Sequence, residues 1–328
     1  MNLCLGIEST AHTFGIAIVT FDGKVLANVK DAVSLTSGGM IPSEVAQHHV
    51  AIKEKMLGEV FSKAGVRMKD ITLIAYSRGP GLAPCLRVGR DFAKQLAQEH
   101  HKPLIGVNHC IAHLTIGDFF AGSTDPVYVY VSGVNTQIVA LAAGVMRVFG
   151  ETLDIGLGNA LDKFGREAGL GFPAGPKIEE RAKKGSYVEL PYSVKGMDVS
   201  FSGMITKATQ LLKKGELVEN MCYSLQETCF AMLVEVTERA LAHTGKQEVV
   251  LIGGVAANQR LCEMMKIMCE ARNTKFYPVP IQYSGDQGAM IAWQGILEWN
   301  AEQRNDVELV EIYPYERTDD IHVTWRKE

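Results

Sequence analysis

Two histidines four residues apart, His109 and His113, have a spacing that suggests metal chemistry. They follow an apolar run, residues 104–107, that predicts a strand leading into a helix. On a helix, side chains four positions apart have Cβ atoms about 5–6 Å from each other on one face, so both imidazoles can reach one metal ion. Tyr130 and Asp286 are the candidates for the remaining ligands. The pair therefore predicts a metal site or, alternatively, two packed or capped histidines.

The metal site does not match that of a zinc peptidase. In the H-E-x-x-H motif a glutamate follows the first histidine and acts as the general base. Cys110 occupies that position here. The peptidase class therefore lacks its catalytic group.

Three turns made of small residues could bring backbone N–H groups to an anion. Turns containing serine follow the apolar runs that end at Ile7 and Val131, and Gly253 and Gly254 follow the apolar run 249–252. Such turns, and a helix N-terminus beside them, favour phosphate. Each is also consistent with an ordinary turn. The dinucleotide-binding and P-loop motifs are both absent, so neither class is predicted.

Two carboxylates follow glycine-rich stretches. Asp162 comes after such a turn, and Glu179 follows residues 169–175. Carboxylates beside glycine turns suit ribose hydroxyl groups. The alternative for Glu179 is an acid that simply stabilises the start of a helix.

The elements that must position these residues repeat. Segments starting at Leu3 and Val127 both read as strand, Ser/Thr turn, strand, glycine turn and strand. Strands alternating with helices follow each segment, which predicts two α/β lobes, each with a mixed sheet, and a break near residues 122–126. The expected helices are 43–64, 86–99, 160–168, 175–184, 204–213, 217–243, 258–272 and 285–300, and the further strands are 71–76, 104–107 and 249–252.

Composition sets limits on the class of protein. The 328 residues include 47% hydrophobic and 21% charged residues, which is typical of a globular chain and excludes disorder. A net charge of −4 gives no electrostatic indication of nucleic-acid binding. The 7 cysteines form no C-x-x-C motif, so we expect free thiols in the core and no zinc knuckle.

No membrane segment is predicted. The N-terminus has no basic region, and Glu8 interrupts its first apolar run. Residues 126–146 carry no charge, but polar residues at 132–137 divide them into a hairpin. We therefore expect a cytoplasmic protein that does not contact a membrane.

Several motifs together resemble one family, the universal tRNA N6-adenosine threonylcarbamoyltransferases, in its archaeal and eukaryotic branch, the catalytic subunit of the KEOPS complex. The resemblance covers nearly the whole chain. The bacterial branch carries an acidic pair in its first turn, where this chain has residues 10–13, Thr-Ala-His-Thr. The motifs are Asn-His-Cys-Ile-Ala-His at 108–113, Gly-Glu-Thr-Leu-Asp-Ile-Gly at 150–156, Gly-Phe-Pro-Ala-Gly-Pro at 171–176, Lys-Gly-Met-Asp-Val-Ser-Phe-Ser-Gly at 195–203 and Gly-Gly-Val-Ala-Ala-Asn at 253–258.

This resemblance implies the two-lobed actin/Hsp70/sugar-kinase-like (ASKHA) fold, an α/β class in which helices flank a mixed sheet in each lobe and a nucleotide binds in the cleft. The first lobe would be residues 1–124 and the second 125–328, with a helical insertion at about 159–245. A C-terminal helix at about 287–310 is the part expected to pack back on the first lobe.

The resemblance also implies the reaction. A threonylcarbamoyl group would pass from threonylcarbamoyl-AMP to the N6 amine of an adenosine adjacent to the anticodon, in tRNAs that read ANN codons. One iron or zinc ion, held by His109, His113, Tyr130 and Asp286, would assist. ATP or AMP could also occupy the cleft, with Mg²⁺ as a companion. Glu8 and His12 are candidates for a catalytic group. The implied nucleotide-binding residues are Tyr130, Val131, Ser132, Gly133, Val134, Asp162, Gly175, Glu179 and Asn258.

The implied partners are tRNA and the other KEOPS subunits, especially a small atypical Ser/Thr protein kinase and a small dimerising subunit. Because the chain is acidic, we expect it to modify tRNA poorly without them. Basic residues that could line one face, or simply lie on solvated helices, are Arg87, Arg90, Lys94, Lys183, Lys184 and Lys207.

Two other functions compete with this interpretation. The same turns would suit an ATPase or small-molecule kinase of the same fold, with Glu8 holding magnesium, and a scaffold subunit without activity is the other alternative.

Three positions depart from the family pattern: Val134 and Ala174 each replace a usual glycine, and Gln287 replaces a usual asparagine.

Overall fold

The computed structural model describes residues 1–33 and 41–326, and it divides into two compact units. Unit 1 comprises Met1–Phe119, Ala143–Met146 and Asp286–Glu328, and unit 2 comprises Phe120–Ala142 and Arg147–Gly285. This division differs from the expected boundary at residue 124. The whole C-terminal segment from Asp286 belongs to unit 1, because α10 packs on the unit 1 sheet.

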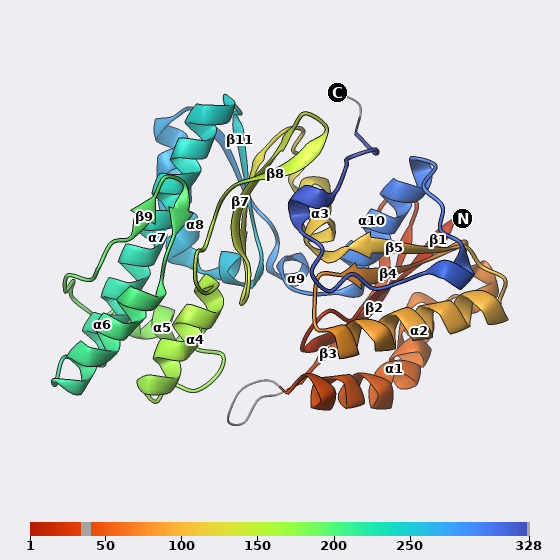
Figure 1. Cartoon of the computed structure of the whole chain (residues 1–328), viewed down its shortest axis with the longest axis horizontal. Helices are drawn as coiled ribbons and strands as arrows, with labels where there is room; N and C mark the ends of the chain where they lie inside the picture. Colours follow the sequence, from red (N-terminus) through yellow and green to blue (C-terminus); the bar gives the residue numbers. More distant parts are fainter. Residues whose placement is uncertain (34–40, 327–328) are drawn as a thin grey trace. The chain divides into compact units, whose positions relative to one another are not determined.

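The sheet of unit 1 has the strand order β3-β2-β1-β4-β5. The first three strands are antiparallel, whereas β4 and β5 run parallel to β1. Figure 1 shows α1 and α2 on one face of the sheet and α10 on the other, which explains why every residue of β1 and β2 is buried. The elements are β1 (Leu3–Glu8), β2 (Thr13–Thr20), β3 (Val25–Ala32), α1 (Pro42–Ala64), η1 (Met68–Asp70), β4 (Leu73–Gly79), α2 (Ala83–Glu99), β5 (Leu104–Asn108), α3 (His109–Ala121), α10 (Gly288–Asn300), η3 (Val307–Leu309) and η4 (Thr318–Asp320).

The sheet of unit 2 has the order β12-β11-β6-β7-β8, which is the topology of unit 1 repeated. Here β6 and β7 are antiparallel, and β11 runs parallel to both β6 and β12. The predicted repeat of two mixed sheets is therefore confirmed. The elements are β6 (Val127–Val131), β7 (Thr136–Ala142), β8 (Val145–Glu151), α4 (Leu157–Glu167), α5 (Gly175–Ala182), β9 (Val194–Lys195), β10 (Asp198–Val199), α6 (Ser202–Lys213), α7 (Val218–Thr244), β11 (Glu248–Ile252), η2 (Gly254–Ala257), α8 (Gln259–Ala271), β12 (Lys275–Pro278) and α9 (Ile281–Ser284).

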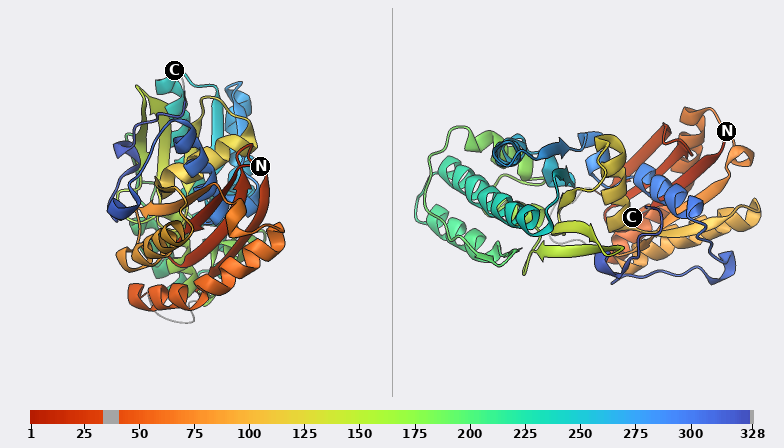
Figure 2. Two further views of the ribbon diagram at one scale, coloured as in Figure 1. Left: turned by 90° about the vertical axis from the view of Figure 1, so that its right-hand side faces the viewer. Right: turned by 90° about the horizontal axis from the view of Figure 1, so that it is seen from above.

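The core of unit 2 lies between its sheet and its helices. Helix α7 contacts α5, α6 and α8 as well as β6 and β7, and Figure 2 shows the green and teal helices lying side by side. Cys222 and Cys229 are fully buried on α7, as the seven-residue spacing predicts. Every cysteine lies in the described part of the chain, and each is a free thiol.

The last predicted helix begins later than expected. Residues 285–300 were expected to be one helix, but α10 starts at Gly288, and Gln287 before it is extended with φ −169° and ψ 157°. A Cβ on Gly288 would lie 2.4 Å from the backbone nitrogen of Ala17, so the helix backbone approaches β2 closely at this point. Asp286 therefore lies in an extended link before the helix, not in its first turn.

A buried acid on α10 predicts pH-dependent stability. Glu298 accepts a 2.8 Å hydrogen bond from Gln294, whose carbonyl accepts from the Thr115 hydroxyl, and burial raises the pKa of Glu298 from 4.5 to about 7. The folded state thus favours the protonated acid. Its contribution to stability is complete below pH 4.5 and is lost as the pH rises through 7.

We expect Glu298→Gln to raise the free energy of unfolding at pH 8 by about 3 kcal/mol, because the amide avoids the cost of a buried charge. The gain should shrink towards pH 5. Urea unfolding at both pH values measures it, with Glu302→Gln as the control because Glu302 is exposed just beyond the helix. An equal gain at both pH values would contradict the assignment.

Candidate functional site

Three side chains of unit 1 converge in an arrangement that can hold a metal ion. His109 and His113 lie one turn apart at the start of α3, and Asp286 comes from the link before α10. One ligand atom from each lies within 4.8 Å of the others. Both histidines are buried and Asp286 is partly exposed. The expectation that the acid belongs to the second lobe is wrong, because the contacts of α10 place it in unit 1.

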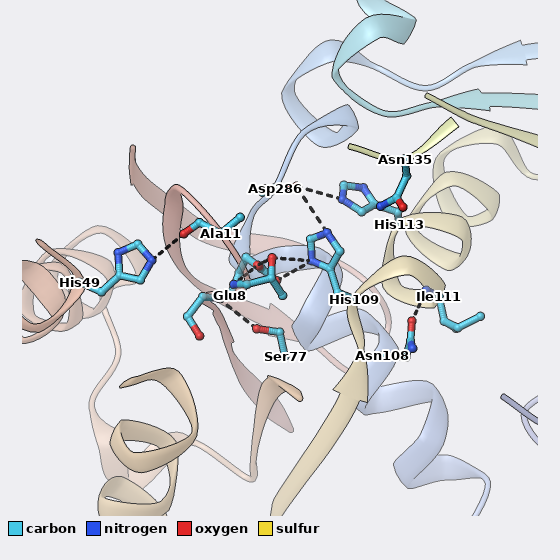
Figure 3. A network of polar contacts seen from close by, with 12 residues as sticks. Glu8, Ala11, His49, Ser77, Asn108, His109, Ile111, His113, Asn135 and Asp286 are labelled. Carbon is cyan, nitrogen blue, oxygen red and sulfur yellow. Dashed lines mark hydrogen bonds and ion pairs between the residues drawn. The ribbon is translucent and has the colours of Figure 1, made fainter. Parts of the chain in front are cut away.

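The geometry directs both imidazoles at the same carboxylate oxygen. Asp286 Oδ1 lies 3.2 Å from His113 Nε2 and 3.6 Å from His109 Nε2 (Figure 3). The two rings are nearly perpendicular, at 83°, with centroids 4.8 Å apart. Two nitrogen donors and one oxygen donor therefore share one small volume.

Glu8 supports His109 from behind. Its Oε2 lies 3.0 Å from Nδ1 of His109 (Figure 3). Its Oε1 accepts from both the backbone N–H and the hydroxyl of Thr10. A carboxylate at Nδ1 fixes the orientation of the ring, so that Nε2 is the nitrogen directed at Asp286 and available to a metal ion. Carboxylate support of this kind is characteristic of metal-bound histidine.

The pKa shifts reflect this cluster of charges. Burial acts to lower the pKa of His109, but the carboxylates of Glu8 and Asp286 outweigh it and raise the value to about 9. Burial lowers the pKa of His113, with a partly opposing effect from Asp286. Burial acts to raise the pKa of Asp286, yet its bond to His113 and the charge of His109 bring it well below its usual range. The surroundings of His109 and Asp286 therefore favour a positive charge between these side chains.

The donor set fits a transition metal. Two imidazoles and one carboxylate, with the remaining coordination positions open, suit zinc in its catalytic form or non-haem iron. The supporting carboxylate of Glu8 meets the further requirement for an oriented ligand. The residues present therefore fit the metal that the resemblance implies.

The first Ser-containing turn differs from its expected role as a phosphate cradle. The Ser9 N–H donates to the Ser77 hydroxyl at 3.0 Å, and the Thr10 N–H donates to Glu8 at 2.7 Å. These amides are used inside unit 1. His12, half-buried in the same turn, has its backbone carbonyl bonded to the Val33 N–H.

The second Ser-containing turn, in unit 2, is built differently. Residues 132–135 close on themselves, since the Ser132 N–H donates to the Asn135 carbonyl and the Asn135 N–H to the Ser132 hydroxyl. The carbonyls of Ser132 and Gly133 accept from the start of α4. The hydrogen bonds found among the described residues do not use the N–H groups of Gly133 and Val134, and Val134 is 69% exposed. The turn therefore leaves two backbone N–H groups, those of Gly133 and Val134, able to bind an anion.

The structure joins Asp162 to the start of α5. The Asp162 carboxylate accepts from the Ala174 N–H at 2.7 Å, directly before Gly175, the first residue of that helix. A Cβ on Gly175 would meet no atom within 4 Å. Gly175 therefore borders open space.

Glu179 and Asn258 both meet the start of α8. Glu179 accepts from the Gln259 N–H at 2.8 Å, and Asn258 caps the helix by accepting from the Leu261 N–H at 3.1 Å. The amide of Asn258 also donates to Gln226 at 2.9 Å. The two predicted nucleotide contacts are thus brought together.

The two glycines before α8 have different roles. Gly253 has φ +105°, and a Cβ there would lie 2.3 Å from the carbonyl oxygen of Val131. Its conformation and packing against β6 both require glycine. A Cβ on Gly254 would meet nothing within 4 Å, so Gly254 is the one that leaves room for a ligand.

Tyr130 is the last predicted ligand. It is buried near the end of β6 in unit 2, and its hydroxyl accepts from the side chain of Asn135 at 3.5 Å. Val131 ends the same strand and is also buried. Tyr130 belongs to unit 2, and its role as a metal ligand is taken up as a proposal below.

Sequence reasoning missed the groups that support the ligands. Thr10 follows β1, Ser77 lies in the second half of β4 and Asn108 ends β5, and these three strands are neighbours in the unit 1 sheet. Asn108 directly precedes the helix of His109 and accepts from the Ile111 N–H at 3.0 Å. An asparagine immediately before a predicted helix is a capping signal that could have identified it.

Among residues 1–33 and 41–326, no helix is both long enough and apolar enough to cross a membrane.

Two mixed sheets of the same topology, each flanked by helices, define the actin/Hsp70/sugar-kinase-like class of folds. The chain is similar in fold to the activator of the 2-hydroxyisocaproyl-CoA dehydratase from Clostridium difficile, solved with bound ADPNP. The TM-score is 0.54 at 12% identity, over 93% of this chain and 99% of the activator.

Within that class the sequence identifies the family. Residues 24–293 match the family described as tRNA N6-adenosine threonylcarbamoyltransferase. A relative of that name from Thermococcus kodakarensis is 54% identical over 98% of this chain and 99% of its own length. The chain belongs to the tRNA N6-adenosine threonylcarbamoyltransferase family and is a transferase of tRNA threonylcarbamoyladenosine biosynthesis.

A longer relative carries the same region. A protein of Methanobrevibacter smithii described as a probable bifunctional tRNA threonylcarbamoyladenosine biosynthesis protein is 49% identical over 98% of this chain, which covers 60% of that protein.

Proposed function

We propose that this transferase moves the threonylcarbamoyl group from threonylcarbamoyl-AMP to the N6 amine of the adenosine adjacent to the anticodon, in tRNAs that read ANN codons. The observation that carries the metal-assisted form of this proposal is the convergence of His109, His113 and Asp286 in front of Glu8. In the reaction, the amine nitrogen bonds to the carbamoyl carbon, the bond from that carbon to the phosphate oxygen breaks, AMP departs and N6 loses a proton.

His109, His113 and Asp286 would hold one iron or zinc ion, with the phenol of Tyr130 as a further ligand. When bound, the ion supplies Lewis-acid polarisation of substrate oxygens and a template for the two reactants. Glu8 keeps the His109 ring in its ligating orientation.

The proton released from N6 requires an acceptor. Of the two candidates, Glu8 is fully buried and engaged with His109 and Thr10. Half-buried His12 follows in the same turn and is the group we assign to this step. The commitment of Glu8 also argues against the kinase alternative, in which that acid would hold magnesium.

Unit 2 supplies the residues proposed for the adenylate. The unused amides of Gly133 and Val134 suit phosphate oxygens, with Val131 and Ser132 forming the start of that turn. Asp162, Gly175, Glu179 and Asn258 surround the starts of α5 and α8, where carboxylates suit ribose hydroxyls and Gly254 leaves room for the base. ATP or AMP would bind at the same place, with Mg²⁺ as their companion.

We expect Glu179→Ala and Gly254→Val each to weaken the binding of threonylcarbamoyl-AMP and AMP about tenfold or more, by loss of a ribose acceptor and by occlusion respectively. Isothermal titration calorimetry measures the affinity. Glu180→Ala is the matched control, because Glu180 is the adjacent carboxylate and pairs on the surface with Lys183. Unchanged affinity in both variants would refute the placement of the adenylate.

Part of the positive charge that could bind tRNA is already paired within the chain, as in the ion pair of Lys183 with Glu180, and the net charge is −4. Arg90 pairs with Asp91 and Glu311, and Lys94 pairs with Glu308. Binding through phosphates depends on free cationic groups. We propose that KEOPS subunits, namely a small atypical Ser/Thr protein kinase and a small dimerising subunit, supply the missing contacts.

The test compares the chain alone with the chain plus those subunits, at physiological salt, using unmodified tRNAs that read ANN codons and tRNAs that do not. We expect at least about tenfold tighter binding in the complex, and product only on the ANN set. If the isolated chain bound and modified both sets as well as the complex did, both the partner and the substrate proposals would fail.

A further inference from the structure

The C-terminal segment of the chain makes contacts along α3, the helix that carries His109 and His113. Residues 301–326, here called the strap, leave α10 and run along the end of β4, visible as the deep-blue segment of Figure 1. The Tyr313 N–H donates to the Arg78 carbonyl at 2.7 Å, and the Gly81 N–H donates to the Pro314 carbonyl at 3.1 Å. A Cβ on Gly79 would lie 1.9 Å from the Tyr313 oxygen. The strap is therefore in direct backbone contact with the sheet.

Glu316 is the principal polar anchor of the strap. Its two oxygens accept from Nη2 and Nε of Arg78 at 3.0 Å and 3.1 Å, a bidentate pair. The second oxygen also accepts from the Asn108 amide at 2.9 Å. The Glu316 side chain is 13% exposed. Charge-assisted bonds of this geometry are strong and directional.

Asn108 transmits this anchor to the helix of the metal ligands. Its amide nitrogen donates to Glu316, while its carbonyl oxygen accepts from the Ile111 N–H in the first turn of α3. A side-chain cap fixes the direction in which a helix leaves the preceding strand. His109 is the next residue, so the bond that orients Asn108 also orients the first ligand.

Two further attachments follow the same helix. The side chains of Thr318 and Cys110 are hydrogen-bonded, and Arg326 pairs with Asp118 near the end of α3. The strap is thus joined to α3 at its first turn and again near its last.

We infer that the strap is a positioning element of the metal centre, acting through Glu316 and Asn108 on His109. This inference rests on the metal site of the proposed function. Replacing Glu316 by glutamine keeps its shape but removes the charge and places an amide donor among the donors of Arg78 and Asn108. Asn108 then loses its fixed orientation, and His109 loses its pre-set position relative to His113 and Asp286.

The experiment measures metal affinity, not activity. Apo protein is titrated with Co²⁺, whose visible spectrum reports ligand geometry, and with Zn²⁺ in competition with a chelator, while thermal unfolding is recorded for each variant. The variants are Glu316→Gln, Asn108→Ser, which retains a cap but cannot reach Glu316, and the double variant. Glu311→Gln is the matched control, because this strap acid pairs with Arg90 on α2 at 3.2 Å, and its side chain has no hydrogen bond or ion pair to α3 among those found in residues 1–33 and 41–326.

We expect Glu316→Gln and Asn108→Ser each to weaken metal binding about tenfold and to alter the Co²⁺ spectrum, as loss of outer-shell support does. The double variant should bind metal with the same affinity as the single variant that binds it less tightly. Glu311→Gln should bind metal as the unaltered chain does. If Glu316→Gln fails to fold, Arg78→Lys, which loses the bidentate fork, replaces it and carries the same expectation.

Wild-type affinity and spectrum in Glu316→Gln, with lowered thermal stability, would overturn the inference and leave the proposed metal site intact. Additive losses in the double variant would show that Glu316 does not act through Asn108. Absence of metal binding by the unaltered chain would instead refute the site itself.

Discussion

Replacing His113 by alanine is expected to abolish stoichiometric metal binding and to lower threonylcarbamoyl transfer by about 10³-fold or more, because a catalytic metal site needs its three protein ligands. Asp286 lies 3.2 Å from His113 Nε2 and 3.6 Å from His109 Nε2, so removal of one ring leaves only two donors of this cluster to hold the ion. Elemental analysis after dialysis, together with product quantification by mass spectrometry, measures both effects.

His48→Ala is the matched control for that substitution. His48 is also a helical histidine paired with an aspartate, Asp31, at 2.9 Å, but it lies on α1 and is 27% exposed. It should retain full metal content and activity. A His113→Ala variant that kept one equivalent of metal would refute the ligand assignment.

The second large effect is expected on the stability of the packing between β1 and α10, which positions Asp286. A Cβ on Gly6 would lie 2.3 Å from the Gly288 carbonyl oxygen and 2.4 Å from the Ala292 nitrogen, both backbone atoms of α10. We expect Gly6→Ala to lower the free energy of unfolding by about 3 kcal/mol, since a helix backbone cannot yield as a side chain can. The displaced helix would carry Asp286 away from α3, so metal affinity should fall as well.

Gly58→Ala tests the same substitution where space is available. Gly58 lies within α1, and a Cβ there would meet no atom within 4 Å. We expect a gain of about 0.5–1 kcal/mol, the helix propensity difference between the two residues. Urea unfolding compares the pair, and wild-type stability in Gly6→Ala would show that the close packing of β1 on α10 is not required.

The fold was predictable from sequence because its signals are local and repeated. The strand-turn-strand pattern at Leu3 and Val127 predicts two mixed sheets, and hydrophobic periodicity locates α1 and α7 to within a residue or two. The start of α10 was not predictable from local signals, since the close approach of Gly288 to β2 depends on contacts between segments far apart in the chain.

The site was predictable only in part, for the same reason. The spacing of His109 and His113 predicts a ligand pair from local geometry, whereas the support of His109 by Glu8 joins residues about a hundred positions apart. The carboxyl ends of β1, β4 and β5 meet at one sheet edge because these strands are parallel. A charged residue ending the buried run of β1 was the available signal, because such residues are rarely buried without a partner.

The most direct test of metal-assisted transfer is a titration of the assembled, metal-stripped complex. Product on an ANN-reading tRNA, formed from threonylcarbamoyl-AMP, is quantified by mass spectrometry as zinc or iron is added in small steps. We expect the rate to rise from near zero and to level off at about one equivalent of metal per chain, with no such rise for His113→Ala. Full activity without metal, or an identical titration for His113→Ala, would contradict the role proposed for His109, His113 and Asp286.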